Sequence, residues 1–143
     1  MANILDKYGY AVIILGVVVI IVLIWVNIFL NIKVDSSVFP TFVNGTTASS
    51  SIIIGLSGVI IGIMLRDEQM PRRTKNFYYG AMLLLLFPIT MLWTTYASLA
   101  GGVLGSWLSY YAVRIALSGL ILSLYIFFGI AVYTVKVSIE EQR

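Results

Sequence analysis

One arginine lies inside a stretch of the sequence that is otherwise apolar. The stretch SYYAVRIALSGL, residues 109–120, surrounds Arg114 with aromatic, aliphatic and small residues. A guanidinium in such a place can attract an anion, or it can anchor a helix by reaching the polar edge of a membrane. Two kinds of chemistry therefore compete for this residue, anion handling and interfacial anchoring.

Most other site chemistry is excluded by composition. The chain has no Cys and no His, which rules out disulfides and cysteine nucleophiles and removes the usual general base and the commonest metal ligand. Thioether ligands remain, but the methionines are better explained as apolar packing residues (Met64, Met70, Met82 and Met91). The sequence predicts no catalytic, cofactor or metal site, and a protein that is not an enzyme.

The chain is too apolar for a soluble domain. Of its 143 residues 60% are hydrophobic and only 10% are charged, whereas ordinary soluble domains carry about 25% charged residues. The predicted fold class is an all-α integral membrane protein. The net charge of +3 does not indicate nucleic acid, because the basic residues cluster at the ends of apolar runs.

Four apolar runs are long enough to cross a bilayer. A hydrocarbon core of about 30 Å needs about 20 helical residues. The runs predict a single domain of four transmembrane helices, with spans at 10–32, 48–65, 77–100 and 107–135. Aromatic residues near the span ends, including Phe77, Tyr78 and Tyr133, are interpreted as interfacial anchors.

The distribution of Lys and Arg predicts the orientation. Seven basic residues fall on one side of this topology, and only Lys33 and Arg114 fall on the other. The protein is therefore expected in the plasma membrane, with both termini in the cytoplasm and the loop 33–47 outside. The seven are Lys7, Arg66, Arg72, Arg73, Lys75, Lys136 and Arg143.

Two features fall in that outer loop. The sequon NGT at Asn44 agrees with an outside position and predicts a glycoprotein. An archaeal source would suit glycosylation here, while in a bacterial protein the sequon would have no meaning. The stretch VFPTFV, residues 38–43, is apolar for a loop, so Phe39 and Phe42 are expected to contact lipid or a partner protein.

The second span carries a stripe of small residues. Ser51, Gly55, Gly58 and Gly62 recur at intervals of three and four, and small residues let helix backbones approach closely in lipid. We expect this face at the closely packed centre of the bundle or at a contact with another subunit.

The third span contains a proline. Pro88 is expected to kink its helix, with hydroxyls at Thr90, Thr94 and Thr95 bonding to exposed backbone groups nearby. A structural kink is favoured over a solute path.

No Asp or Glu lies inside any of the four spans. Proton-coupled pumps depend on a membrane-buried carboxylate. Four-helix drug antiporters and proteolipid rotor subunits have this size and number of spans, but they need such an acid. The chain lacks this membrane-buried acid and therefore differs from both classes.

The depth of Arg114 favours the anchor. If the fourth helix enters the membrane near residues 107–110, Arg114 lies only about 6–10 Å inside, within reach of the interface. We predict that it contacts a lipid phosphate or a neighbouring chain.

Two functions remain after these exclusions. The leading hypothesis is a non-catalytic structural or accessory subunit of a larger membrane complex, for example one of the respiratory or oxidase type. Its partners would be membrane lipids and other membrane protein subunits, with no nucleic acid and no cofactor. The alternative is a small oligomeric channel or carrier, with an anion as its solute and Arg114 near its outer mouth.

Overall fold

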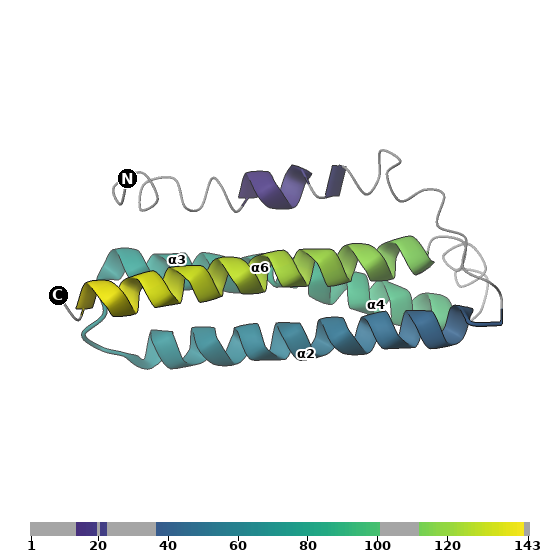
Figure 1. The fold of residues 1–143 in the computed structure, drawn as a ribbon, viewed down its shortest axis with the longest axis horizontal. Coiled ribbons are helices and arrows are strands. Elements are labelled where there is room, and N and C mark those ends of the chain that lie inside the picture. The colour runs from purple at the N-terminus through teal and green to yellow at the C-terminus, as the bar shows by residue number, and fades with distance from the viewer. Residues whose placement is uncertain (1–13, 20, 23–36, 101–111, 142–143) are drawn as a thin grey trace.

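The computed structural model describes residues 14–19, 21–22, 37–100 and 112–141 of the chain, and this part is helical. The four long elements are α2 (Phe39–Arg66), α3 (Arg72–Leu84), α4 (Leu86–Ala100) and α6 (Ala112–Glu141) (Figure 1). Residues 14–19 and 21–22 are helical as well, and no strand occurs among the described residues. The prediction of an all-α fold is confirmed.

Three helical stretches of the described chain are long and apolar enough to cross a membrane. They are Pro40–Arg66, Arg72–Ala97 and Arg114–Glu141. Each overlaps one of the last three expected spans. Of the first expected span, 10–32, only residues 14–19 and 21–22 are described, and the rest lies outside the described residues.

The helix α2 begins nine residues earlier than expected. Its first turn contains Pro40, whose fixed φ and missing N–H suit the start of a helix. The expected outer loop 33–47 is therefore helical from Phe39 onward, and this part of the prediction was wrong. Asn44 lies exposed on the helix instead of in a loop, and its glycosylation stays a prediction.

The polar run NGTTASSS was the reason for expecting a loop, and hydrogen bonds explain why it remains helical. Each hydroxyl in the run donates to a carbonyl three or four residues earlier in the same helix, at 2.8–3.0 Å. A hydroxyl bonded in this way leaves no unpaired donor, and the carbonyl has a second lone pair for the helical N–H. The residues are Thr46, Thr47, Ser49, Ser50 and Ser51.

The helices α3 and α4 form one rod with a break at Leu85. Pro88 has no N–H, so the carbonyl of Leu84 loses its helical donor and would meet the proline ring. On either side the ladder resumes, with Leu85 N donating to the Ala81 carbonyl at 3.1 Å and Ile89 N to the Leu85 carbonyl at 3.2 Å. The proline accounts for the change in direction between the two helices in Figure 1.

Two other boundaries differ from the expected spans. The third span begins at Arg72 instead of residue 77, directly after Pro71, so the connection to α2 is only 67–71. The fourth continues to Glu141, six residues past its expected end, with an ion pair of 3.8 Å between Lys136 Nζ and Glu140 Oε1 in its last turns. Residues 107–111 lie outside the described part of the chain.

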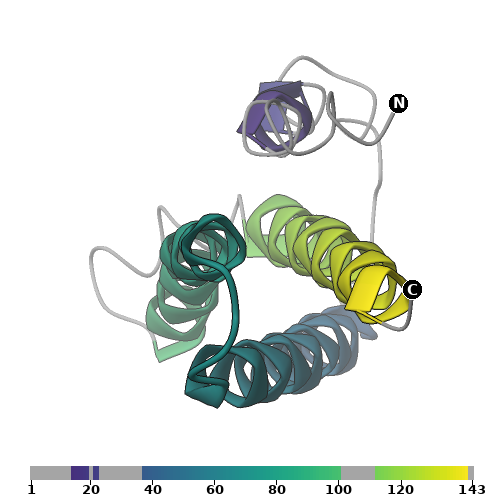
Figure 2. The ribbon, with the colours of Figure 1, turned by 90° about the vertical axis from the view of Figure 1, so that its left-hand side faces the viewer.

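The three rods, namely α2, α6 and the α3–α4 rod, pack side by side (Figures 1 and 2). Their two ends differ in the number of charged residues. The helices α2 and α6 run in the same direction, and the α3–α4 rod runs against them and contacts both. We call the end with the 67–71 connection and Glu141 the charged end. It holds every charged residue of the described chain except Arg114, which lies near the opposite end.

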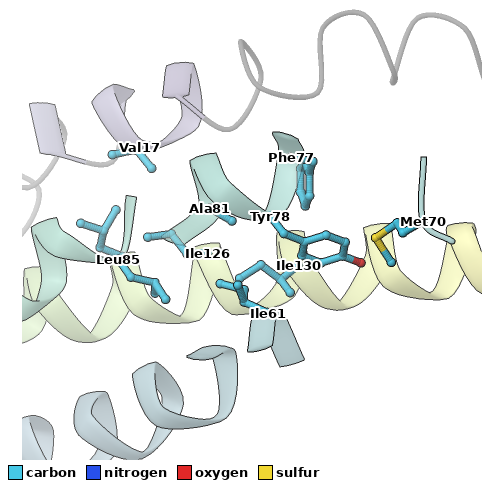
Figure 3. Close-up of a cluster of buried hydrophobic side chains, with 10 residues drawn as sticks. Val17, Ile61, Met70, Phe77, Tyr78, Ala81, Leu85, Ile126 and Ile130 are labelled. Carbon is cyan, nitrogen blue, oxygen red and sulfur yellow. The ribbon is translucent and has the colours of Figure 1, made fainter. Parts of the chain in front are cut away.

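The hydrophobic core occupies the half of the bundle toward the charged end. Ile61, Tyr78, Leu122, Ile126 and Ile130 are at most 2% exposed. Figure 3 shows Ile61, Tyr78, Ile126 and Ile130 close together, with Met70 of the connection at the edge of the same cluster. Burial of Met70 holds the 67–71 connection against the core.

The helical residues 14–19 and 21–22 pack on the outside of this bundle. The segment lies on the side of the bundle away from α2 (Figure 2), and its Val17 is 4% exposed and belongs to the core cluster. At Gly16 a Cβ atom would overlap the hydroxyl of Tyr125 on α6. Gly16 is thus the residue that lets this segment approach α6, a role that the sequence analysis did not foresee.

We expect Gly16→Val to destabilise the isolated protein by about 1–3 kcal/mol, because overpacking forces Tyr125 or the segment to move. Thermal unfolding in detergent measures this change. Gly55→Val is the matched control, since a Cβ at Gly55 meets nothing within 4 Å. Equal unfolding temperatures for the two variants would contradict this contact.

Candidate functional site

The helix α2 carries two stripes of small residues, and the bundle uses only one of them. The buried stripe repeats at intervals of three, four and seven and contains two aliphatic residues besides its hydroxyls. It faces α6 and the α3–α4 rod, the two partners of α2 in the fold. Its buried members are Val43, Thr47, Ser50, Ser57 and Ile61.

The expected stripe of Ser51, Gly55, Gly58 and Gly62 lies one residue further along, about 100° around the helix. All four residues are exposed, and a Cβ at any of the three glycines would meet no atom within 4 Å. This stripe is therefore not the packed centre of the bundle, and that part of the expectation was wrong. Its contact with another subunit stays a prediction.

Buried hydroxyls from all three rods line the interior. Each donates its proton to a carbonyl of its own helix, at 2.6–2.9 Å. In this arrangement each of these hydroxyls offers a neighbour only its lone pairs. The set comprises Thr47, Ser50, Ser57, Thr95, Ser118 and Ser123, of which the sequence analysis had named only Thr95.

The half-buried Arg114 is the third residue of α6, at the end of the bundle where four of these hydroxyls also lie. Its carbonyl accepts the hydroxyl of Ser118 at 2.6 Å. Within the described chain it is the sole charged residue outside the charged end. A place near a helix end lets the guanidinium reach polar surroundings, as an anchor would require.

The structure describes the residues expected to contact lipid or a partner protein, and it describes the proline with its nearby threonines. Phe39 opens α2, and Phe42 is half-buried on its second turn. Pro88 is buried in the bundle. The three threonines after it bond within their own helix, to the carbonyls of Phe87, Thr90 and Met91, at 2.7–2.8 Å (Thr90, Thr94 and Thr95).

An aromatic cluster joins α3 to α6 near the charged end. Phe77 stacks on Tyr133 with ring centroids 3.8 Å apart, and Tyr78 meets both rings edge-on. Phe77 and Tyr78 are 4% and 0% exposed, so they are core residues instead of the expected interfacial anchors. Their neighbour Tyr79 is exposed.

One hydrogen bond ties this cluster together. The oxygens Tyr78 Oη and Thr134 Oγ1 lie 2.8 Å apart, and Thr134 donates its own proton to the Ile130 carbonyl at 2.8 Å. Tyr78 must therefore be the donor of the bond between them. This is a side-chain bond between two rods, and it fixes the register of α3 on α6.

The surface of α4 holds an open depression of about 430 Å³. It is lined by Ile89, Leu92, Trp93 and Tyr96, which share one face of the helix. Trp93 is 73% exposed. An apolar partner would suit this lining, which has no charged group to orient a polar ligand. Within the described residues, no group of three acidic, His or Cys side chains could hold a metal ion.

We expect Tyr78→Phe and Thr134→Val each to lower the free energy of unfolding by about 1 kcal/mol, because each removes the inter-rod bond. The double variant should lose less than the sum, by about 0.6 kcal/mol or more. Unfolding titrations of the four proteins in detergent measure this coupling. Additive losses would show that the two side chains do not act together.

No protein-family model, no curated protein and no solved structure matches this chain. A function has to be inferred from its residues and from the geometry described above.

Proposed function

We propose that this chain is a non-catalytic structural subunit of a larger multi-subunit complex in the plasma membrane. Three apolar helices long enough to cross a bilayer support membrane insertion. The sequence supplies neither His nor Cys, and the described hydroxyls at the centre of the bundle bond to backbone carbonyls. The chain is suited to holding other subunits in place.

The observation that carries this proposal is the outward stripe of α2. Gly55, Gly58 and Gly62 leave open space beside their backbone, on a helix whose other side already serves the bundle. In lipid, exposed apolar side chains gain little from association, whereas a glycine stripe allows close backbone contact and dispersion energy. Large exposed side chains lie along one side of the stripe, about 100° around the helix, and would form one wall of the contact (Ile52, Leu56, Val59 and Ile63).

The charged end indicates how the subunit is oriented. Five of the six described basic residues lie there, at the end of α2, in the first turn of α3 and near the end of α6. The positive-inside rule supports a cytoplasmic position for this end and therefore for the C-terminus. The N-terminus follows to the same side if the first apolar run also crosses the membrane.

We expect Gly58→Leu to release the protein from its complex. A leucine would hold the partner helix away, while the isolated protein should unfold at the wild-type temperature because Gly58 contacts nothing in the bundle. Mild detergent extraction and native gel electrophoresis measure the first effect, and thermal unfolding measures the second.

Gly45→Leu is the control, with the same change on another exposed face of α2. A complex that survives Gly58→Leu intact, or is lost equally in both variants, would contradict the role of the stripe.

A second candidate function is a small oligomeric channel or carrier. Buried hydroxyls near Arg114 support it, since a hydroxyl-lined helix bundle with one cation at its mouth could admit a solute. The direction of the hydrogen bonds weighs against an anion, because the hydroxyl protons are already used. Anions need donors along their path.

The variant Arg114→Leu separates the two functions. For a structural subunit, we expect less intact complex after extraction, because the anchor at the outer interface is lost, and no solute flux by the wild-type protein in liposomes. For a channel, the wild type conducts and Arg114→Leu abolishes flux while assembly is normal. Flux of anions or neutral solutes through purified wild-type protein would overturn the subunit proposal.

A further inference from the structure

One exposed face of α3 changes from basic to polar to apolar along its length. Arg72, Asn76, Tyr79 and Leu83 are all exposed and fall within a sector of about 60° on the helix. Over about 16 Å they present a guanidinium, an amide, a phenol and an aliphatic chain. Leu86, 54% exposed, follows at the start of α4.

The basic end of this face is not neutralised by the protein. The first turn of α3 contains Arg72 and Arg73 and no acidic residue. Within the described chain neither arginine forms an ion pair. On the adjacent connection, the Asp67 carboxylate accepts the N–H of Gln69 at 2.9 Å. The segment 66–75 has four basic and two acidic residues, so it attracts anions.

The surface is held in place by the core. Met70 is 5% exposed and fixes the connection before α3, and the N–H of Lys75 donates to the Pro71 carbonyl at 3.1 Å. Phe77 and Tyr78, on the inner side of the same helix, are buried in the aromatic cluster. The order of the outward side chains is therefore set by the packing of the inward ones.

We propose that this face binds one anionic phospholipid of the leaflet at the charged end. The phosphate accepts hydrogen bonds from Arg72, with Arg73 adding positive charge, because a guanidinium fork matches phosphate oxygens. Tyr79 lies at the level of the glycerol, where aromatic rings are favoured. The acyl chains lie along Leu83 and Leu86, which are 62% and 54% exposed.

The apolar half of the face selects a lipid over a soluble phosphate. A free anion would contact only the arginines, whereas a phospholipid covers the whole gradient from Arg72 to Leu83. The headgroup must be anionic because the excess charge of the segment is positive, and basic residues near a membrane surface favour anionic lipids. This site rests on the membrane placement and not on which complex the chain joins.

The test is native mass spectrometry of the purified full-length protein, titrated with phosphatidylglycerol or with phosphatidylcholine of the same acyl chains. We expect the wild type to bind phosphatidylglycerol about fivefold more tightly or better. Arg72→Gln should weaken phosphatidylglycerol binding about fivefold and phosphatidylcholine binding less, because both lipids have a phosphate but only phosphatidylglycerol has a net negative charge. Leu83→Ser should weaken binding of both lipids, since it touches only the acyl chains.

Lys136→Gln is the charge-matched control at the same end of the bundle, on α6. It should change phosphatidylglycerol binding less than about twofold, because Lys136 faces Glu140 and lies on a different rod. Equal binding of the two lipids by the wild type, or equal losses in Arg72→Gln and Lys136→Gln, would overturn the site. Displacement of phosphatidylglycerol by inorganic phosphate would also overturn it, because the ligand would then be a soluble anion.

Discussion

The hydrogen bond from a Ser or Thr hydroxyl to a carbonyl of its own helix is the interaction on which this structure depends. It lets α2 begin at Phe39 and pass through a run of polar residues without unwinding. It also leaves no unpaired donor when Thr47, Ser50 and Ser57 are buried, so these side chains pack like small apolar residues. Among the described residues, no fully buried side-chain nitrogen or oxygen lacks a partner.

The same constraint separates charge from the body of the bundle. A hydroxyl can satisfy its proton locally, but a carboxylate or an ammonium in an apolar rod cannot. The described acids and all but one of the basic residues accordingly lie at one end, outside the core. Arg114 is tolerated near the other end because its long side chain can reach polar surroundings from a helix terminus. The division into a charged end and a hydroxyl-lined half follows from this difference.

The sequence predicted features that depend on composition and on the chemistry of single residues. Long apolar runs located the three rods, and proline chemistry at Pro88 agrees with the break at Leu85. Relative position was harder. The buried and the exposed stripes of α2 have similar spacing and differ by one residue, so glycine content does not show which of them packs inside the bundle. Only the neighbouring rods decide which stripe is covered, and they are distant in sequence.

Other features were missed because they depend on pairs of residues. Tyr78 and Thr134 are 56 positions apart, and only the fold brings them within a hydrogen bond. The contact of Gly16 with Tyr125 is of the same kind. A tyrosine near the end of an apolar run is typical of an interfacial anchor, and Tyr79 is exposed, as an anchor would be. Its neighbour Tyr78 points about 100° away around the helix and is buried in the core.

The two proposed contact surfaces use opposite physical properties of their helices. The stripe of α2 is defined by side chains that are missing, which favours a rigid helix as its partner because a backbone must approach closely. The face of α3 is defined by side chains that project and change in polarity, which favours a flexible amphipathic molecule. Since the surfaces lie on different rods, a subunit could contact a protein through one and a lipid through the other. A lipid on α3 would then help fix the depth at which α2 presents its glycines.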